Sequence, residues 1–111
     1  MPTQAQASPV WVTNPTDAAQ GTIDKDTMNA GVRDIKADGQ SAVTRWQART
    51  SSGTVLDKDD CVDSNGANNG YVGCHVYLGG AYFFIKVCTR DFSNDIGYEG
   101  CTSWEAYGWA K

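Results

Sequence analysis

Apolar and polar positions change their spacing along the chain, and this change divides it into an extended start, a helix and a set of strands. The first 20 residues are rich in Pro, Thr, Ala and Gln and show almost no periodicity. Only Val10-Trp11-Val12 interrupts them with a short apolar run. Residues 1–20 are therefore predicted to form an extended arm that carries one short strand.

Apolar residues recur at helical spacing after this arm. Met28, Val32 and Ile35 stand at i, i+4 and i+7, and the charged residues Lys25, Arg33, Asp34 and Lys36 lie on the rest of the predicted helix. Thr22 is one of two candidate N-caps, and Asp38-Gly39 is a plausible C-terminal stop. The pattern predicts one helix of about four turns.

The spacing changes to a period of two from residue 42. Residues 42–49 alternate in the manner of a strand, and Ser51-Ser52-Gly53 predicts a turn into a second strand at 54–56. Further on, two runs of aromatic and β-branched residues flank Gly79-Gly80, which predicts a second hairpin between Tyr71 and Cys88. A last strand is expected from Cys101 to Trp109.

The second hairpin has one wholly apolar face when Leu78 pairs with Ala81 across the turn, and this face is predicted to be core. Its members are Val72, Cys74, Val76, Leu78, Ala81, Phe83, Ile85 and Val87. The opposite face of this hairpin carries both aromatic and polar side chains, among them His75, Tyr77, Tyr82, Phe84 and Lys86. The expected fold is thus α+β: an extended arm, one helix, and an antiparallel sheet of four to five strands stapled by two disulfides.

The cysteines close two segments of equal length. Residues 61–74 and 88–101 both end in Gly-Tyr-x-Gly-Cys, which indicates a 27-residue internal repeat from about residue 50. The repeat favours the disulfides Cys61–Cys74 and Cys88–Cys101, each stabilising by ~3 kcal/mol. A bond between Cys74 and Cys88 is disfavoured because they face opposite sides of the hairpin. The crossed pairing, Cys61–Cys88 with Cys74–Cys101, remains the alternative.

The 111 residues amount to one domain, with the arm at 1–20 and a disulfide-stapled unit at 21–111. Four cysteines in so short a chain are typical of exported proteins. Ala5-Gln6-Ala7 before Ser8 matches the A-x-A site of secretory signals, so residues 1–7 are interpreted as a signal-peptide remnant, with a chance match as the alternative. The expected location is extracellular, cell-surface or periplasmic.

The charge balance narrows the classes of partner. Nine Lys and Arg against 13 Asp and Glu give a net charge of −4, and no basic run occurs, which argues against nucleic-acid binding. No apolar stretch approaches the roughly 18 residues of a membrane span. No cofactor is expected.

Candidate catalytic groups are few. The single histidine, His75, has no recognisable nucleophile to work with, so no enzyme is predicted. Four aspartates lie around Cys61, and we interpret them chiefly as a solvated acidic segment rather than as a glycosidase pair. A weak calcium candidate consists of Asp59, Asp63 and Asn65, although the spacing fails the EF-hand template.

The aromatic inventory carries the functional prediction. Four Trp and five Tyr exceed what one small core accommodates, so some should be exposed or covered by another chain. The expected interface residues are Val10, Trp11, Val12, His75, Tyr77, Tyr82, Phe84, Trp104 and Trp109. The alternative is that the arm and the predicted helix cover the aromatic face of the 71–88 hairpin.

The predicted function is an exported, non-enzymatic module that binds other protein chains, as a subunit of a surface or filament assembly. A helix followed by a disulfide-bearing sheet resembles the globular heads of pilin-like subunits at the level of fold. Two alternatives are a carbohydrate-binding module with exposed Trp and Tyr, and a secreted inhibitor or toxin that presents a disulfide-closed loop at 64–70 or 92–97.

Overall fold

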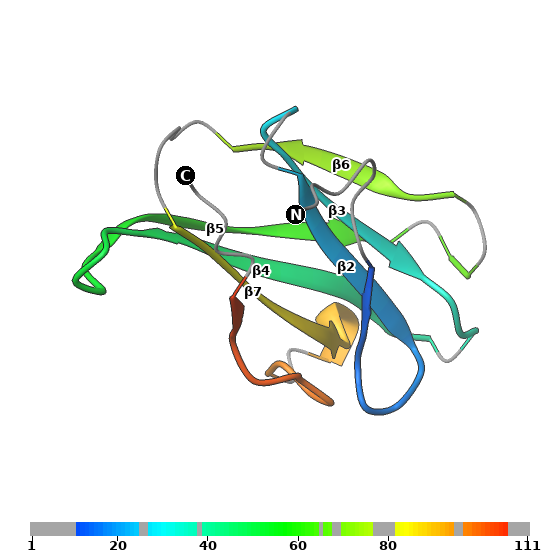
Figure 1. Cartoon of the computed structure of the whole chain (residues 1–111). Helices are drawn as coiled ribbons and strands as arrows, with labels where there is room; N and C mark the ends of the chain where they lie inside the picture. The colour runs from blue at the N-terminus through cyan, green and yellow to red at the C-terminus, as the bar shows by residue number, and fades with distance from the viewer. Residues whose placement is uncertain are drawn as a thin grey trace, which may run out of the picture.

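Two antiparallel four-stranded sheets pack face to face in the computed structural model, which describes residues 11–24, 27–37, 39–64, 66–67, 70–76, 82–94 and 97–106 (Figure 1). The first sheet has the order β1 (Val12–Thr13), β2 (Ala19–Asp24), β3 (Asn29–Asp34) and β6 (Val72–His75). The second has the order β5 (Val55–Asp63), β4 (Ser41–Arg49), β7 (Tyr82–Arg90) and β8 (Glu105–Ala106). A single 3₁₀ turn, η1 (Phe92–Asn94), follows β7.

The core lies between the sheets and takes side chains from both. The two largest side chains, Trp46 and Phe83, come from the second sheet. The principal members are Ala19, Ile23, Ala30 and Val32 from the first sheet and Trp46, Phe83, Ile85 and Val87 from the second. All of them are at most 3% exposed, which removes their apolar area from water and supplies the main driving force for folding.

The predicted helix is wrong, and with it the α+β class: its residues form the β2–β3 hairpin. In the observed register Ile23 lies opposite Ala30, and Gly21 lies opposite Val32. Met28 and Val32 are on one side of a strand as well as of a helix, so their spacing does not separate the two structures. The inward positions are filled largely by Ala and Gly, which a search for large apolar residues overlooks.

The resemblance to pilin-like heads depended on that helix and falls with it. Among the described residues, no helix is long and apolar enough to cross a membrane.

The hairpin expected across Gly79-Gly80 is also wrong in its pairing. β6 pairs with β3 in the first sheet, whereas β7 lies between β4 and β8 in the second. The predicted inward side is nevertheless correct where it is described, because strands of facing sheets share a core without pairing. Val76, Phe83, Ile85 and Val87 are buried, and Val72 and Cys74 pack against them. The turn residues 77–81 lie outside the described residues.

Other strand predictions are confirmed with shifted bounds. β4 and β5 form the predicted hairpin, with a bulge between Ala48 and Arg49. The strand expected in the arm is β1, which pairs with β2 of the same chain. The last strand, expected at 101–109, is present as β8 at Glu105–Ala106, and residues 107–111 lie outside the described residues.

The predicted disulfide connectivity is confirmed. Cys61–Cys74 joins β5 to β6 and so ties one sheet to the other, while Cys88–Cys101 joins β7 to the segment that precedes β8. The crossed pairing is excluded. Both bridges span 13 residues of sequence, and the internal repeat beyond them stays a prediction.

Candidate functional site

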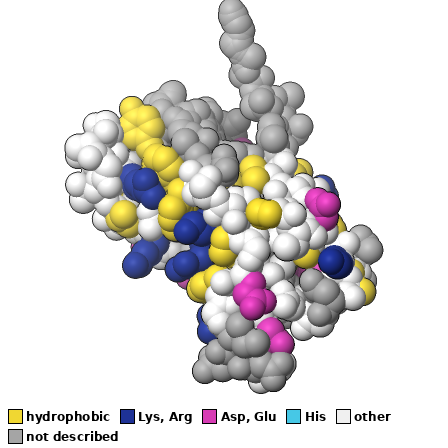
Figure 2. All heavy atoms as spheres, turned by 90° about the horizontal axis from the view of Figure 1, so that it is seen from below, with side chains coloured by type: hydrophobic (Ala, Val, Ile, Leu, Met, Phe, Trp, Pro, Cys, Tyr) yellow, Lys and Arg dark blue, Asp and Glu magenta, His cyan; other side chains and the backbone are white. Residues whose placement is uncertain are grey.

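The outer side of the second sheet gathers basic and aromatic side chains, and we call it the cation–aromatic face. Alternation places the members in β4 and β7 outward, because their neighbours Trp46, Ala48, Ile85 and Val87 point into the core. The face consists of Arg45, Arg49, Lys58, Lys86 and Arg90 together with Tyr82, Phe84, Phe92, Tyr98 and Trp104. Figure 2 shows dark-blue basic side chains grouped beside yellow hydrophobic ones.

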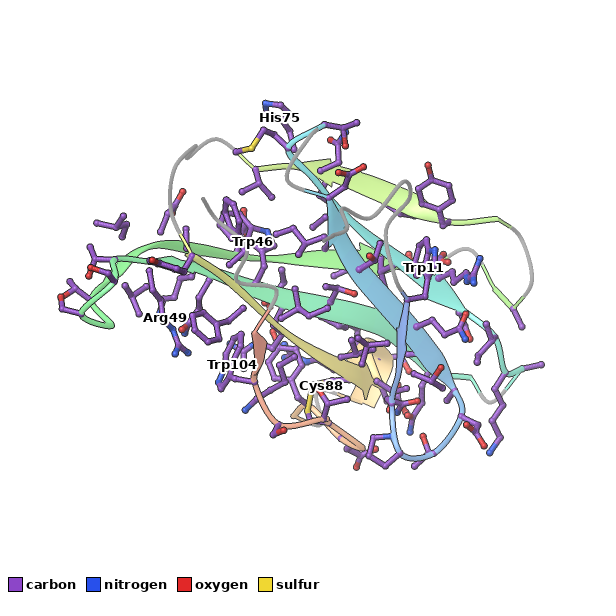
Figure 3. The ribbon with its side chains drawn as sticks, viewed as in Figure 1. Trp11, Trp46, Arg49, His75, Cys88 and Trp104 are labelled. Carbon is purple, nitrogen blue, oxygen red and sulfur yellow. A yellow bond between two sulfur atoms is a disulfide. The ribbon has the colours of Figure 1, made fainter. Side chains whose placement is uncertain are left out.

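Arg49 and Lys86 converge on the aromatic rings at one end of this face. The Arg49 guanidinium lies 4.0 Å from the Phe84 ring centroid and 5.6 Å from that of Trp104. The Lys86 ammonium lies 5.0 Å from the same indole. Trp46 lies between the sheets, whereas Arg49 and Trp104 lie on the outer side (Figure 3). Each cation–π contact contributes about 0.5–1 kcal/mol at an exposed site and holds the cation in place.

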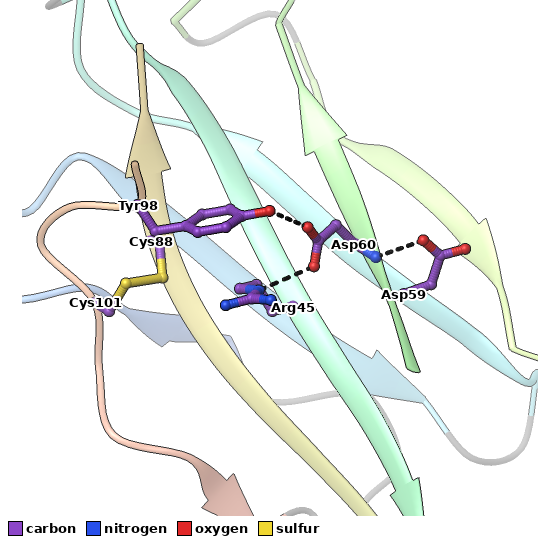
Figure 4. A network of polar contacts seen from close by, with 6 residues as sticks. All are labelled: Arg45, Asp59, Asp60, Cys88, Tyr98 and Cys101. Atoms are coloured by element: carbon purple, nitrogen blue, oxygen red, sulfur yellow. Dashed lines mark hydrogen bonds and ion pairs between the residues drawn. A yellow bond between two sulfur atoms is a disulfide. The ribbon is translucent and has the colours of Figure 1, made fainter. Parts of the chain in front are cut away.

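Tyr98 organises the other end of the face. Its ring lies 4.2 Å from the Arg45 guanidinium and 5.0 Å from that of Arg90. Its hydroxyl donates a hydrogen bond to Asp60, whose second oxygen accepts one from Arg45 Nε at 3.1 Å (Figure 4). Burial raises the pKa of Tyr98 above 10.0, and the hydrogen bond to Asp60 and its negative charge raise it further.

The segment that carries Tyr98 and Trp104 is fixed to β7 by backbone contacts. Thr89 and Glu99 exchange two hydrogen bonds of 2.9 and 2.8 Å, and the Thr102 amide donates to the Val87 carbonyl at 3.0 Å. The Cys88–Cys101 disulfide lies between these contacts (Figure 4). Residues 97–106 thus present both aromatic rings from a position defined by the strand beneath them.

A hollow of about 260 Å³ lies beside Trp104 and is lined by residues from both sides of β4 and β5. Besides the indole, its lining is mainly polar, so that it offers both a flat apolar surface and hydrogen-bonding groups. The lining residues are Arg45, Trp46, Gln47, Lys58, Asp59, Asp60 and Trp104. This combination suits a ligand with a planar or apolar part and several polar groups.

The charges of this face are only partly neutralised. Arg45 forms an ion pair with Asp60. No described acidic residue forms an ion pair with Arg49, Lys58 or Lys86; Arg49 Nε instead donates to the side-chain oxygen of Gln47 at 2.8 Å. The outer face therefore combines positive charge with aromatic surface on a chain whose net charge is −4.

The expected interface residues divide between two regions. Tyr82, Phe84 and Trp104 belong to the cation–aromatic face. Those from the first sheet lie elsewhere: His75 is exposed at the end of β6 (Figure 3). Val12 is half-buried in β1. Val10, Tyr77 and Trp109 lie outside the described residues.

Trp11 is held by its own chain. The Arg33 guanidinium lies 4.2 Å from its ring centroid, and Tyr71 meets it edge-on at 5.6 Å between centroids. The described end of the arm therefore packs on the first sheet of its own chain.

Sequence reasoning missed the basic members of the face and Tyr98. A usable signal was present, since Arg45 and Arg49 in β4 and Lys86 and Arg90 in β7 recur at even spacing and so project from the same side of each strand. None of these four residues was among the expected interface residues.

The calcium candidate is not assembled. Asp63 is buried, and one of its carboxylate oxygens accepts a hydrogen bond from the Asp34 amide at 3.0 Å. Asp59 is exposed four residues earlier on the same strand, about 13 Å away. Asn65 lies outside the described residues, and the described part of the chain contains no group of three acidic, His or Cys side chains able to hold a metal ion.

All four cysteines are bonded in disulfides, so the chain has no free thiol to act as a nucleophile. The loops of the inhibitor alternative, 64–70 and 92–97, lie partly outside the described residues. No family model matches the chain, and comparison with curated proteins and with solved structures found no match either.

Proposed function

We propose that this protein is an exported, non-enzymatic module that binds an acidic protein chain through its cation–aromatic face. Two disulfides suit the oxidising conditions of the extracellular space, the cell surface or the periplasm. The proposal depends above all on the stacking of Arg49 on Phe84 and beside Trp104 on the outside of a sheet.

Arginine, tryptophan and tyrosine are the residues that dominate binding energy in protein interfaces. Here they are also preorganised, because Arg45 is fixed by Asp60 and Tyr98, and Arg49 is fixed by Gln47 and Phe84. A side chain that is already ordered loses less conformational entropy on binding, so more of its contact energy contributes to affinity.

The sign of the charge selects the kind of partner. Arg49, Lys58 and Lys86 lack a described carboxylate partner, and an acidic protein segment would supply it. Such complementarity accelerates association and disfavours basic partners. We therefore expect binding to weaken as salt is raised.

Carbohydrate binding is the second candidate, because the hollow places Trp104 next to the hydrogen-bonding groups of Gln47 and Asp60. A neutral sugar stacks on an indole and bonds to amides and carboxylates. It would, however, leave the three cations without compensation, which is why an acidic protein partner is preferred.

Calorimetric titration with a soluble glutamate-rich peptide and with a neutral glucan oligosaccharide separates these candidates. We expect salt-sensitive binding of the peptide, weakened at least about tenfold by Arg49→Gln with Lys86→Gln, an effect of ~1.4 kcal/mol. Arg33→Gln with Lys36→Gln removes the same charge from the first sheet and should leave the affinity unchanged.

Peptide binding that survives the face variant, or an absence of peptide binding, would contradict the proposal. Binding of the glucan alone, lost on Trp104→Ala, would replace it with the carbohydrate function.

A further inference from the structure

The first half of β5 is an exposed edge whose two sides carry opposite charge. Residues 55–59 are all exposed, with Val55 at 43% and Leu56 at 52%. β5 is the outermost strand of its sheet, and the β4–β5 hairpin extends to one side of the molecule beyond the first sheet (Figure 1). An unpaired strand edge with exposed apolar residues is a natural place for another chain to dock.

The acidic side of this edge consists of Asp57 and Asp59. The register places them opposite Ala48 and Trp46, and therefore on the side of the hairpin away from Lys58. Their carboxylates accept hydrogen bonds of 2.9 and 2.8 Å from the amides of the residues that follow them. No cationic side chain among the described residues forms an ion pair with either one.

One chain thus displays both halves of a complementary pair. The acidic edge, defined as Leu56, Asp57 and Asp59, offers two carboxylates and the exposed Leu56 side chain, whereas Val55 lies opposite Arg49 and so on the other side of the strand. The cation–aromatic face offers uncompensated cations beside the rings of Phe84 and Trp104.

We infer that the acidic protein chain bound by the cation–aromatic face is a second copy of this protein, which presents its acidic edge. The inference rests on the proposed function and adds the identity of the partner. Asp57 and Asp59 of one copy would pair with Arg49 and Lys86 of the next, while Leu56 packs on the aromatic rings.

The two surfaces are different, so the contact is heterologous and leaves one free face and one free edge on every pair of copies. Association then continues head to tail, and the product is an open chain of copies or a ring. Exposed charges form the contact, so it should weaken with rising ionic strength.

Charge reversal with mixing tests this contact by sedimentation velocity. The native protein should associate in a concentration-dependent and salt-sensitive way. Reversal of the face, Arg49→Glu with Lys86→Glu, and reversal of the edge, Asp57→Lys with Asp59→Lys, should each weaken self-association at least about tenfold, because each abolishes attraction at every contact.

An equal mixture of the two reversed proteins should associate again, since acidic edges then meet basic faces and basic edges meet acidic faces. This recovery cannot arise from misfolded variants. A mixture that remains monomeric, or native association that is indifferent to the edge reversal, would overturn the inference.

Failure of self-association can be distinguished from failure of the proposed function. A native protein that stays monomeric but binds the glutamate-rich peptide through Arg49 and Lys86 retains the function and loses the second copy as its partner. A protein that does neither loses both.

Discussion

The side-chain amide of Asn14 donates a hydrogen bond of 2.8 Å to the carbonyl of Gly100, 86 residues further along the chain. The same side chain accepts hydrogen bonds from the amides of Ala18 and Ala19 at 2.8 and 2.9 Å, and it is 2% exposed. One buried amide therefore shapes the turn between β1 and β2 and ties it to the segment that carries Tyr98.

Replacing Asn14 with Ala should lower the free energy of unfolding by at least about 2 kcal/mol, because two buried backbone amides lose their acceptor. Thr13→Ala, a substitution at the exposed end of β1, should change it by less than about 0.5 kcal/mol. Urea denaturation of both variants checks this. Similar small losses in the two variants would show that water replaces the Asn14 side chain.

The sequence alone predicted the structure correctly where the pattern involved residues close together in the chain. The alternation of residues 42–49 predicted β4, and the equal lengths of the two cysteine segments predicted both disulfides. The inward side of residues 72–87 was also correct where it is described, since a buried strand face is apolar whatever its partner.

The errors arose where a choice depends on distant parts of the chain. β7 pairs with β4, whose residues stand 33 to 49 positions earlier, from Arg49↔Tyr82 to Ser41↔Arg90, instead of with β6 directly before it. The β2–β3 hairpin buries Ala19, Gly21 and Ala30, whose small size is explained only by the opposite sheet. Likewise, Arg45 and Arg49 become part of a site only when β7 and residues 97–106 bring aromatic rings beside them.

Gly21 lies where the two sheets approach each other closely. A Cβ atom at this position would lie 2.1 Å from Thr44 Oγ1 and 2.7 Å from Val87 Cγ2. Gly21→Ala should therefore destabilise the protein by about 1–3 kcal/mol through overpacking. Gly73→Ala, on edge strand β6, meets only Tyr71 at 3.9 Å and should be tolerated. Thermal unfolding of the pair measures the difference, and equal melting temperatures would contradict the close approach.

Adjacent phenylalanines in β7 should respond differently to truncation. Phe83 is 2% exposed within the core, so Phe83→Ala should cost about 3–5 kcal/mol. Phe84 is half-buried on the outer face under Arg49, and Phe84→Ala should cost less but should weaken peptide binding. Denaturant unfolding combined with the calorimetric titration distinguishes the two. Equal losses of stability would mean that the outer face is also covered within the monomer.

The two disulfides should have similar energetic effects and different functional ones. Each spans 13 residues, so replacing either pair with alanines should cost ~3 kcal/mol by loop entropy. Loss of Cys88–Cys101 also releases the segment that presents Tyr98 and Trp104, and should therefore reduce peptide binding under native conditions. Loss of Cys61–Cys74 should leave the affinity of the folded fraction unchanged. Unimpaired binding without Cys88–Cys101 would show that the backbone contacts to β7 suffice.

Tyr98 should make the stability of the protein sensitive to alkaline pH. Its pKa is raised above 10.0 in the folded state, chiefly by burial and then by Asp60, so the folded protein favours the neutral phenol. The resulting stabilisation is fully present below the unfolded-state pKa and is lost as the pH rises through the raised, folded-state pKa.

Tyr98→Phe has no proton to lose. We expect this variant to be less stable at neutral pH, because the hydrogen bond to Asp60 is gone, but to lose stability less steeply than the native protein as the pH rises above 10.0. Denaturant midpoints measured across this range test the difference. The control is Tyr71→Phe, because Tyr71 is an exposed tyrosine directly before β6 of the first sheet. If native protein and Tyr98→Phe lose stability in parallel, the contact of Tyr98 with Asp60 does not persist in solution.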